Sequence, residues 1–153
     1  MAEKTKVEYL ADYLEVDPST IEQSKYDENV YETEDGEEYA VYTDDDADRE
    51  VREQIVDSLW AFNPDFIVKH MRGYDELSSF DERETVNALE EVQSKLAESA
   101  NPLVKAIIED IDEFVEDAVD SDGRGHFISS YDGEELELAD DKGYIQYYAY
   151  RIN

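Results

Sequence analysis

The chain contains no cysteine and few basic residues. None of its 153 residues is Cys, which excludes disulfides, thiolate metal sites and cysteine nucleophiles. Only 13 residues are Lys or Arg, against 43 Asp or Glu, so the formal net charge is −30 at pH 7. Because DNA binding requires Lys and Arg to release counterions from phosphates, we expect no direct nucleic-acid binding and no attachment to an anionic membrane. A basic protein surface would be attracted strongly, and salt would weaken that attraction.

Long apolar runs are missing as well. No stretch approaches the roughly 18 apolar residues of a membrane span, and the start, Met-Ala-Glu-Lys-Thr-Lys, leads into no apolar signal-peptide segment. We therefore expect a cytoplasmic protein without a membrane span. Hydrophobic residues still make up 41% of the chain and include twelve tyrosines, which is enough for one core and is unlike a disordered composition.

The spacing of apolar residues predicts a single α+β domain over residues 1–153. Segregated runs of helices and strands favour a small antiparallel sheet, built from an N-terminal hairpin plus C-terminal strands and packed against four to five helices. Asp35-Gly36 fits a two-residue type I′ hairpin turn. We expect helices over 6–16, 47–62, 64–71, 81–99 and 102–119, a hairpin over 29–43, and strands over 126–131, 135–139 and 144–151.

Polar residues mark the expected helix starts. Asp44, Asp45 and Asp46 precede the second helix, where they can cap it. Asn63-Pro64 and Asn101-Pro102 each place a capping side chain before a proline at the first helical position. The tyrosine-rich last strand, if it lies at a sheet edge, could pair with a second copy and form a homodimer.

Residues 120–135, DSDGRGHFISSYDGEE, concentrate glycines, carboxylates, one Arg and one His. A calcium-loop reading fails on spacing. Setting Gly123 as the sixth loop position places Ala118 at the first and Ser129 at the twelfth, where carboxylates are needed. The plain structural interpretation is a helix-terminating turn with glycines at positive φ, followed by a strand.

A catalytic interpretation of this loop stays open beside the structural one. His126 would act as general base, oriented by Asp122 or Asp132, with Ser129 or Ser130 as nucleophile. No nucleophile-elbow or triad motif supports it. Since few cations serve many anions, we expect a neighbouring carboxylate to hold Arg124. The candidate loop site consists of Asp122, Arg124, His126, Ser129 and Asp132.

Metal binding has little support from the sequence. The chain has two histidines, so a histidine-based site would need His70 and His126 to converge. A carboxylate-only Mg²⁺ or Ca²⁺ site is compatible with so many acids. We nevertheless expect no metal and no cofactor.

The expected helix over 102–119 carries a row of acids away from its apolar stripe. Like charges at i,i+4 destabilise a helix by a few tenths of a kcal/mol each, so packing must offset this repulsion. A DNA duplex carries one charge per roughly 1.7 Å of axis, a density that this row could approach together with the acidic segments 34–38 and 44–50. The candidate partner-binding face consists of Glu109, Asp112, Glu113, Glu116, Asp117 and Asp120.

The chain resembles a family of small acidic phage and prophage proteins of unassigned function. The resemblance spans most of the chain beyond about residue 26, and its distinctive strings are DGRGH at 122–126 and SSYDGEE at 129–135. Ser58–Pro64, Val68–His70 and the tyrosine-rich end fit the same pattern. The resemblance implies a viral or mobile-element origin and expression in a bacterial cytoplasm, and it implies no activity and no site residues.

Three functional hypotheses follow. The first is an acidic interaction protein, not an enzyme, that mimics nucleic acid and blocks the basic surface of a host DNA- or RNA-binding protein, as antirestriction or anti-CRISPR proteins do. The second is a phage accessory protein or enzyme that uses the 120–135 loop, with or without a divalent cation. The third is acidity as an adaptation to high salt, without mimicry.

Overall fold

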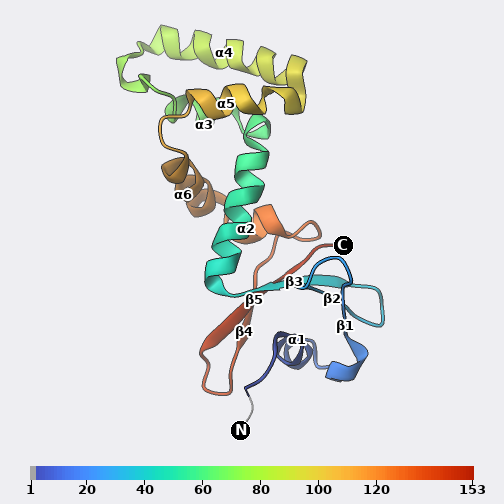
Figure 1. Ribbon diagram of the computed structural model, residues 1–153. Coiled ribbons are helices and arrows are strands. Elements are labelled where there is room, and N and C mark those ends of the chain that lie inside the picture. The colour runs from blue at the N-terminus through green and yellow to red at the C-terminus, as the bar shows by residue number, and fades with distance from the viewer. Residues whose placement is uncertain (1–2) are drawn as a thin grey trace. The chain divides into compact units, whose positions relative to one another are not determined.

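The computed structural model describes residues 3–153 and has an α+β fold with one five-stranded antiparallel sheet. The strand order is β1-β2-β3-β5-β4, so the hairpin strands and the C-terminal strands share one sheet, as the sequence predicts (Figure 1). The strands are β1 (Glu22–Gln23), β2 (Val30–Glu32), β3 (Glu38–Tyr42), β4 (Leu136–Ala139) and β5 (Ile145–Arg151).

The helices account for most of the remaining elements. None of those within residues 3–153 combines the length and the apolar character needed to cross a bilayer. The α-helices are α1 (Lys6–Leu14), α2 (Asp44–Asp57), α3 (Pro64–Lys69), α4 (Ser79–Leu96), α5 (Asn101–Ile107), α6 (Ile111–Asp122) and α7 (Arg124–Ile128). Short 3-10 helices are η1 (Pro18–Thr20), η2 (Leu59–Ala61), η3 (Tyr74–Glu76) and η4 (Ala97–Ala100).

Backbone contacts divide the chain into two compact units. The sheet unit comprises Met1–Val51 and Asp122–Asn153, and the helical unit comprises Arg52–Ser121. The boundaries fall inside α2 and α6. The single domain expected over residues 1–153 stays a prediction.

In the sheet unit, α1 covers one face of the sheet (Figure 1). Strand alternation sends Tyr39, Val41 and Ala149 to this face, where they pack with Leu10 and Ala11 of the helix. Full burial of the Leu10 and Val41 side chains contributes about 1.5–3 kcal/mol each. The β3–β5 pairing therefore joins segments more than a hundred residues apart in one core.

Strand β5 lies inside the sheet, between β3 and β4, so the condition for homodimer pairing through this tyrosine-rich strand is not met. Tyr150, on the face away from α1, is fully buried. The edges of the sheet are β1 and β4. The physical reason is burial, because a strand this rich in tyrosine gains more from neighbours on both sides than from an exposed edge.

The hairpin turn also differs from the expected type I′. Pairing of β2 with β3 stops at Glu32 and Glu38, which leaves a five-residue connection. Gly36 has φ +83°, whereas Asp35 is not among the described residues with positive φ, which a type I′ turn requires at both central positions. Instead the Thr33 N–H donates to the Glu37 carbonyl at 2.9 Å, and the Gly36 N–H donates to the Thr33 carbonyl at 3.0 Å.

The expected helix over 102–119 is interrupted. Ile108 adopts extended backbone geometry and forms a β-bridge with Met71. The Arg72 N–H donates to the Ile107 carbonyl at 3.0 Å, and the Glu109 N–H donates to the His70 carbonyl at 2.9 Å. These tertiary hydrogen bonds replace helical ones, and the buried Ile108 side chain anchors the break. Helical periodicity alone does not reveal it, because the apolar stripe continues across it.

The expected strand over 126–131 is wrong, because residues 124–128 form α7. Gly123 precedes this helix at φ +83°. Gly125 is buried, and a Cβ there would lie 2.8 Å from the Glu134 carbonyl carbon and 2.9 Å from the Glu135 nitrogen. The glycine thus permits close backbone packing that no other residue allows.

The expected capping residues have mixed outcomes. Asn63 caps α3, accepting a 2.8 Å hydrogen bond from the Asp65 N–H. Asn101 instead accepts from the Trp60 N–H at 3.0 Å and donates to the Val56 carbonyl at 2.9 Å, so it ties α5 to the end of α2. At α2, Thr43 precedes the acidic residues and accepts from the Asp46 N–H at 3.2 Å, so Asp44–46 form the first turn.

Candidate functional site: an acidic pocket in the helical unit

Four of the six residues of the predicted acidic face line one pocket of about 790 Å³. They are Glu109, Glu113, Asp117 and Asp120. Of the other two, Asp112 forms a 2.8 Å ion pair with Arg52, and Glu116 is exposed. Because the helix breaks at Ile108, Glu109 lies ahead of α6 instead of continuing its helical row.

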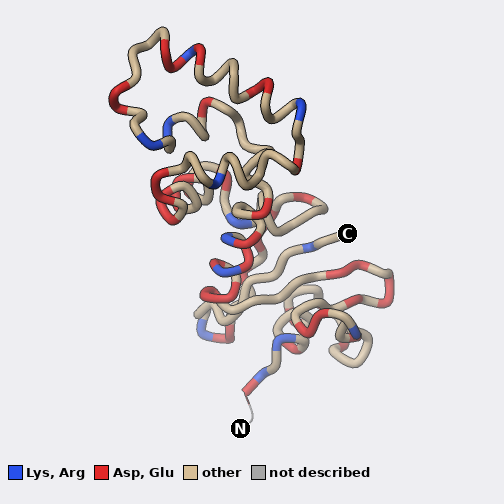
Figure 2. The backbone as a smooth tube through the Cα atoms, turned by 45° about the horizontal axis from the view of Figure 1, so that its top comes forward, with Lys and Arg blue, Asp and Glu red and all other residues tan. Residues whose placement is uncertain are grey.

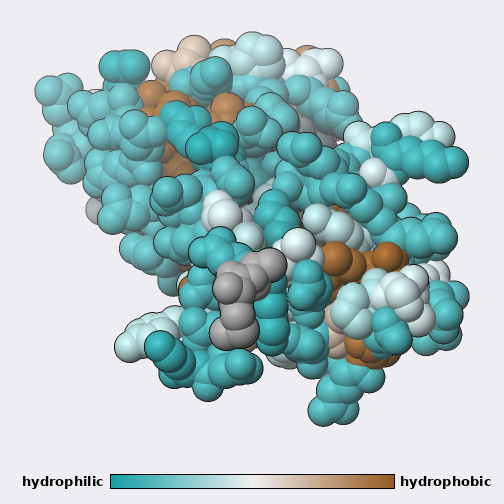
Figure 3. Space-filling view, turned by 60° about the horizontal axis from the view of Figure 1, so that its bottom comes forward, coloured by the Kyte–Doolittle hydropathy of each residue, from teal (hydrophilic) through white to brown (hydrophobic). Residues whose placement is uncertain are grey.

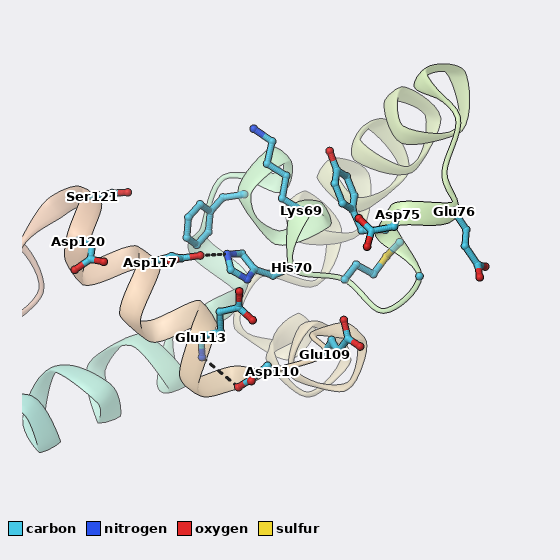
Figure 4. A pocket seen from close by; sticks show the side chains of 14 residues that line it. Lys69, His70, Asp75, Glu76, Glu109, Asp110, Glu113, Asp117, Asp120 and Ser121 are labelled. Carbon is cyan, nitrogen blue, oxygen red and sulfur yellow. Dashed lines mark hydrogen bonds and ion pairs between the residues drawn. The ribbon is translucent and has the colours of Figure 1, made fainter.

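This pocket, called the acidic pocket below, is formed by α3, the segment through η3, and α6 (Figure 4). It contains seven carboxylates and one lysine, so its charge is strongly negative. Its lining residues are Phe66, Lys69, His70, Met71, Gly73, Tyr74, Asp75, Glu76, Glu109, Asp110, Glu113, Asp117, Asp120 and Ser121.

Aromatic rings give the pocket a rigid base. Phe114 of α6 is fully buried, and its ring centroid lies 4.9 Å from that of Phe66 and 5.0 Å from that of Phe62, both edge-on. Edge-to-face pairs of this kind add about 0.5–1.5 kcal/mol each beyond burial. The apolar stripe of α6 therefore holds its acidic face toward the pocket despite the repulsion among the carboxylates.

His70 connects the aromatic base to the acidic row. Its imidazole lies 5.0 Å from the Phe66 ring and 5.1 Å from the Phe114 ring, centroid to centroid. Its Nε2 lies 3.1 Å from Oδ2 of Asp117, and its side chain is only 12% exposed (Figure 4). His70 ends α3 because its N–H still donates to the Ile67 carbonyl while its own carbonyl accepts from Glu109.

The α6 carboxylates lie at helical spacing along one wall. Glu113 and Asp117 are four residues apart and Asp117 and Asp120 three apart, which makes each pair neighbours on the helix surface. Asp110 caps the helix, accepting from the Glu113 N–H at 3.2 Å. Carboxylates beside partly buried aromatic side chains suit guanidinium or ammonium groups, through charge-assisted hydrogen bonds and cation–π contact.

In the candidate loop site, Arg124 organises the sheet unit. Its Nε and Nη2 donate to the two carboxylate oxygens of Glu135 at 2.8 and 3.2 Å, and its Nη1 donates to Asp44 at 2.9 Å and Asp48 at 3.0 Å. Desolvation by itself would lower the pKa of Arg124, but the hydrogen bonds to Glu135 and Asp44 outweigh it and raise the pKa. The guanidinium also lies over the Tyr148 ring at 4.5 Å.

Tyr150 extends this network into the core. Its hydroxyl donates to Glu135 at 2.5 Å. Burial, reinforced by that hydrogen bond, raises the pKa of Tyr150 above its ordinary value. The expectation that a carboxylate holds Arg124 is therefore confirmed, with three carboxylates from two distant segments as partners.

Ser129 and Asp132 meet in the same loop. The buried Ser129 hydroxyl lies 2.7 Å from the Arg151 carbonyl and 3.0 Å from Asp132 Oδ1, and it accepts from the Gly133 N–H at 3.3 Å. A hydroxyl with these partners fixes the turn to the last strand. His126 is exposed and its ring packs edge-on against Phe127, while Asp122 is exposed at the end of α6.

Three other acids in the described part of the chain cluster tightly enough to hold a cation. Asp44, Asp45 and Asp48 each place one ligand atom within 4.8 Å of the others. Two of them already accept hydrogen bonds from Arg124, which supplies the positive charge there. The two histidines belong to different units.

Acidic residues are spread along both units beyond these sites (Figure 2). The face displayed in Figure 3 is mostly hydrophilic, with small apolar patches. The sequence signal for the acidic pocket was the spacing of acids along 109–120. No local sequence pattern predicted that residues 69–76 line the pocket, because their position depends on the tertiary pairing of Met71 with Ile108.

Comparison with known proteins provides no relative. No family model matches the chain, and neither the curated proteins nor the solved structures include a significant match.

Proposed function

We propose that this protein is an acidic interaction protein that binds the basic, nucleic-acid-binding surface of a host protein and thereby competes with DNA or RNA. The observation that carries the proposal is the acidic pocket, in which seven carboxylates accompany one lysine. Such a site needs no reaction chemistry. It needs carboxylates held in place, because preorganised charge raises association rates and specificity.

The structure supports rigid placement of these carboxylates. The α6 acids project from a helix whose opposite side is buried through Phe114, Val115 and Ala118. The α3 side is fixed by Ile67 and Val68, which are fully buried. Charges on elements packed in this way lose little entropy when a partner binds.

The test is capture of nucleic-acid-binding proteins from a bacterial lysate, followed by competition. The immobilised protein is expected to retain such proteins at low salt and to release them at high salt, and free protein should displace labelled DNA or RNA from the purified partner. If no nucleic-acid-binding protein is retained at low salt, the proposal fails.

Matched charge variants separate pocket binding from bulk charge. Glu113→Gln with Asp117→Asn and Asp120→Asn removes three charges from the pocket. Glu84→Gln with Glu90→Gln and Glu91→Gln removes three exposed charges from α4. We expect the first triple variant to lose more affinity for the basic partner than the second. Equal losses would indicate attraction by net charge alone.

A second function, adaptation to high salt without mimicry, is favoured by one observation, the spread of acids along both units (Figure 2). Under that hypothesis, added KCl stabilises the fold by screening repulsion. A thermal midpoint that rises steeply and continues to rise at molar KCl would favour it. A midpoint that levels off once the charges are screened would favour the interaction protein.

A further inference from the structure

We propose that His70 makes cation binding in the acidic pocket pH-sensitive, so that the pocket releases a cationic partner when the pH falls. This inference rests on the proposed function, because it concerns regulation of the same pocket. The supporting geometry is the position of one imidazole at the wall of a pocket that otherwise presents mainly carboxylates.

His70 is the one imidazole among the residues that line this pocket. Imidazole is the side chain whose charge ordinarily changes between about pH 5 and 8, whereas carboxylates ordinarily stay ionised there. The charged groups that face the same pocket come from α3, from η3 and its flank, and from the residues before and within α6. They are Lys69, Asp75, Glu76, Glu109, Asp110, Glu113, Asp117 and Asp120.

The direction of the effect follows from this arrangement. When His70 is neutral, its Nε2 lies 3.1 Å from Oδ2 of Asp117 and the pocket retains its full negative charge. When His70 is protonated, its positive charge neutralises part of the pocket and binds Asp117 more strongly. A proton on His70 and a cation from a partner thus compete for the same carboxylates, so each weakens the binding of the other.

The His70 side chain lies where its charge would affect cation binding by the pocket. His70 is only 12% exposed and is enclosed by Phe66 and Phe114. A charge at that position is screened less by solvent than a charge on a free surface. His126, which is exposed in the other unit, provides a matched control.

The first experiment measures the binding of a fluorescently labelled oligoarginine peptide by anisotropy at low salt. Wild-type protein is expected to bind roughly two- to fivefold more weakly near pH 5.5 than near pH 7.5, the effect of one added charge in a partly solvated site. His70→Gln keeps a donor for Asp117 but cannot gain a charge, so its affinity should be nearly independent of pH. His126→Gln should retain the wild-type dependence.

A second measurement uses the wild-type protein alone. Calorimetry near pH 6.5, where imidazole is partly protonated, should show proton release on peptide binding, seen as a binding enthalpy that changes with the ionisation enthalpy of the buffer. His70→Gln should abolish that change.

The two proposals fail in different ways. If the peptide binds but His70→Gln shows the same pH dependence as wild type, the role of His70 is overturned and the proposed function stands. If the acidic pocket binds no oligoarginine at any pH, as shown by equal binding of the two triple charge variants, both proposals are overturned.

Discussion

The two units differ in how far their acidic residues are paired with cations. In the sheet unit, Asp44, Asp48 and Glu135 converge on Arg124, whose side chain is 11% exposed. In the helical unit, Glu113, Asp117 and Asp120 share a pocket in which Lys69 is the one lysine. The excess of acid is thus partly compensated by one buried cation in the sheet unit and left largely uncompensated in the pocket.

The difference separates acids that surround a buried cation from acids that line a pocket with a single lysine. A buried cation must be paired, because desolvation otherwise costs several kcal/mol. An acidic row without matching cations gains nothing for folding and costs a few tenths of a kcal/mol per like-charged pair. The proposed function accounts for this row by a basic partner protein whose cations would offset the repulsion.

The largest expected effect comes from removing the cation of the sheet unit. Arg124→Ala leaves Glu135 beside Tyr150 without its partner and should lower the free energy of unfolding by about 2–4 kcal/mol. Urea unfolding measures it. Arg124→Lys keeps the charge but loses the two-pronged contact with Glu135, so it should fall in between. A loss below about 0.5 kcal/mol for Arg124→Ala would remove the contrast between the units, since surface substitutions lie in that range.

Next in size is Gly125→Ala, which tests the close approach that positions the Arg124 network. The added methyl would meet the backbone of Glu134 and Glu135, and we expect destabilisation of about 1–3 kcal/mol. Gly143→Ala is the matched control. It has φ +88° and no atom near the added methyl, so only the backbone strain of about 1 kcal/mol applies. Equal losses for both variants would refute a role for close packing at Gly125.

A smaller effect is expected at alkaline pH. Burial, reinforced by the carboxylate of Glu37, raises the pKa of Tyr39 to about 12, whereas an unfolded tyrosine titrates near 10. The raised folded-state pKa contributes stability that is fully present below about pH 10 and is lost as the pH rises toward 12, by up to about 2 kcal/mol.

Urea unfolding across that pH range measures the loss of stability. Tyr39→Phe should reduce the dependence of the unfolding free energy on pH. Tyr26→Phe, at a residue that is 98% exposed, should leave that dependence unchanged. If both variants behave alike, the buried tyrosine does not couple folding to pH in the way described.

The smallest expected effect belongs to the acidic pocket. The triple variant Glu113→Gln, Asp117→Asn and Asp120→Asn should stabilise the helical unit by a few tenths of a kcal/mol up to about 1 kcal/mol, because it relieves like-charge neighbours. Thermal unfolding at low salt measures the gain, and high salt should remove it. A destabilised variant would mean that these carboxylates support the fold, which would weaken the case for a binding site.

The sequence by itself determined the fold class and the chemistry of the surface. The strand-favouring tyrosines and aliphatic residues in 39–42 and 144–151 and the apolar stripes of the helices are local patterns, and the structure retains them as strands and helices. The charge of −30 likewise needs no tertiary information. The carboxylate partnership of Arg124 was predictable because so few cations face so many acids.

Tertiary structure decided what local patterns cannot encode. The break at Ile108 depends on backbone hydrogen bonds with residues 70–72. The helix over 124–128 depends on the contact of Gly125 with residues 133–135. Asn101 binds the backbone of η2 instead of capping α5. Each case replaces a local hydrogen bond or propensity with a contact between distant segments. The same pairing of Met71 with Ile108 brings His70 to the acidic row. The sequence therefore predicted four of the seven acids of the pocket but not their histidine neighbour.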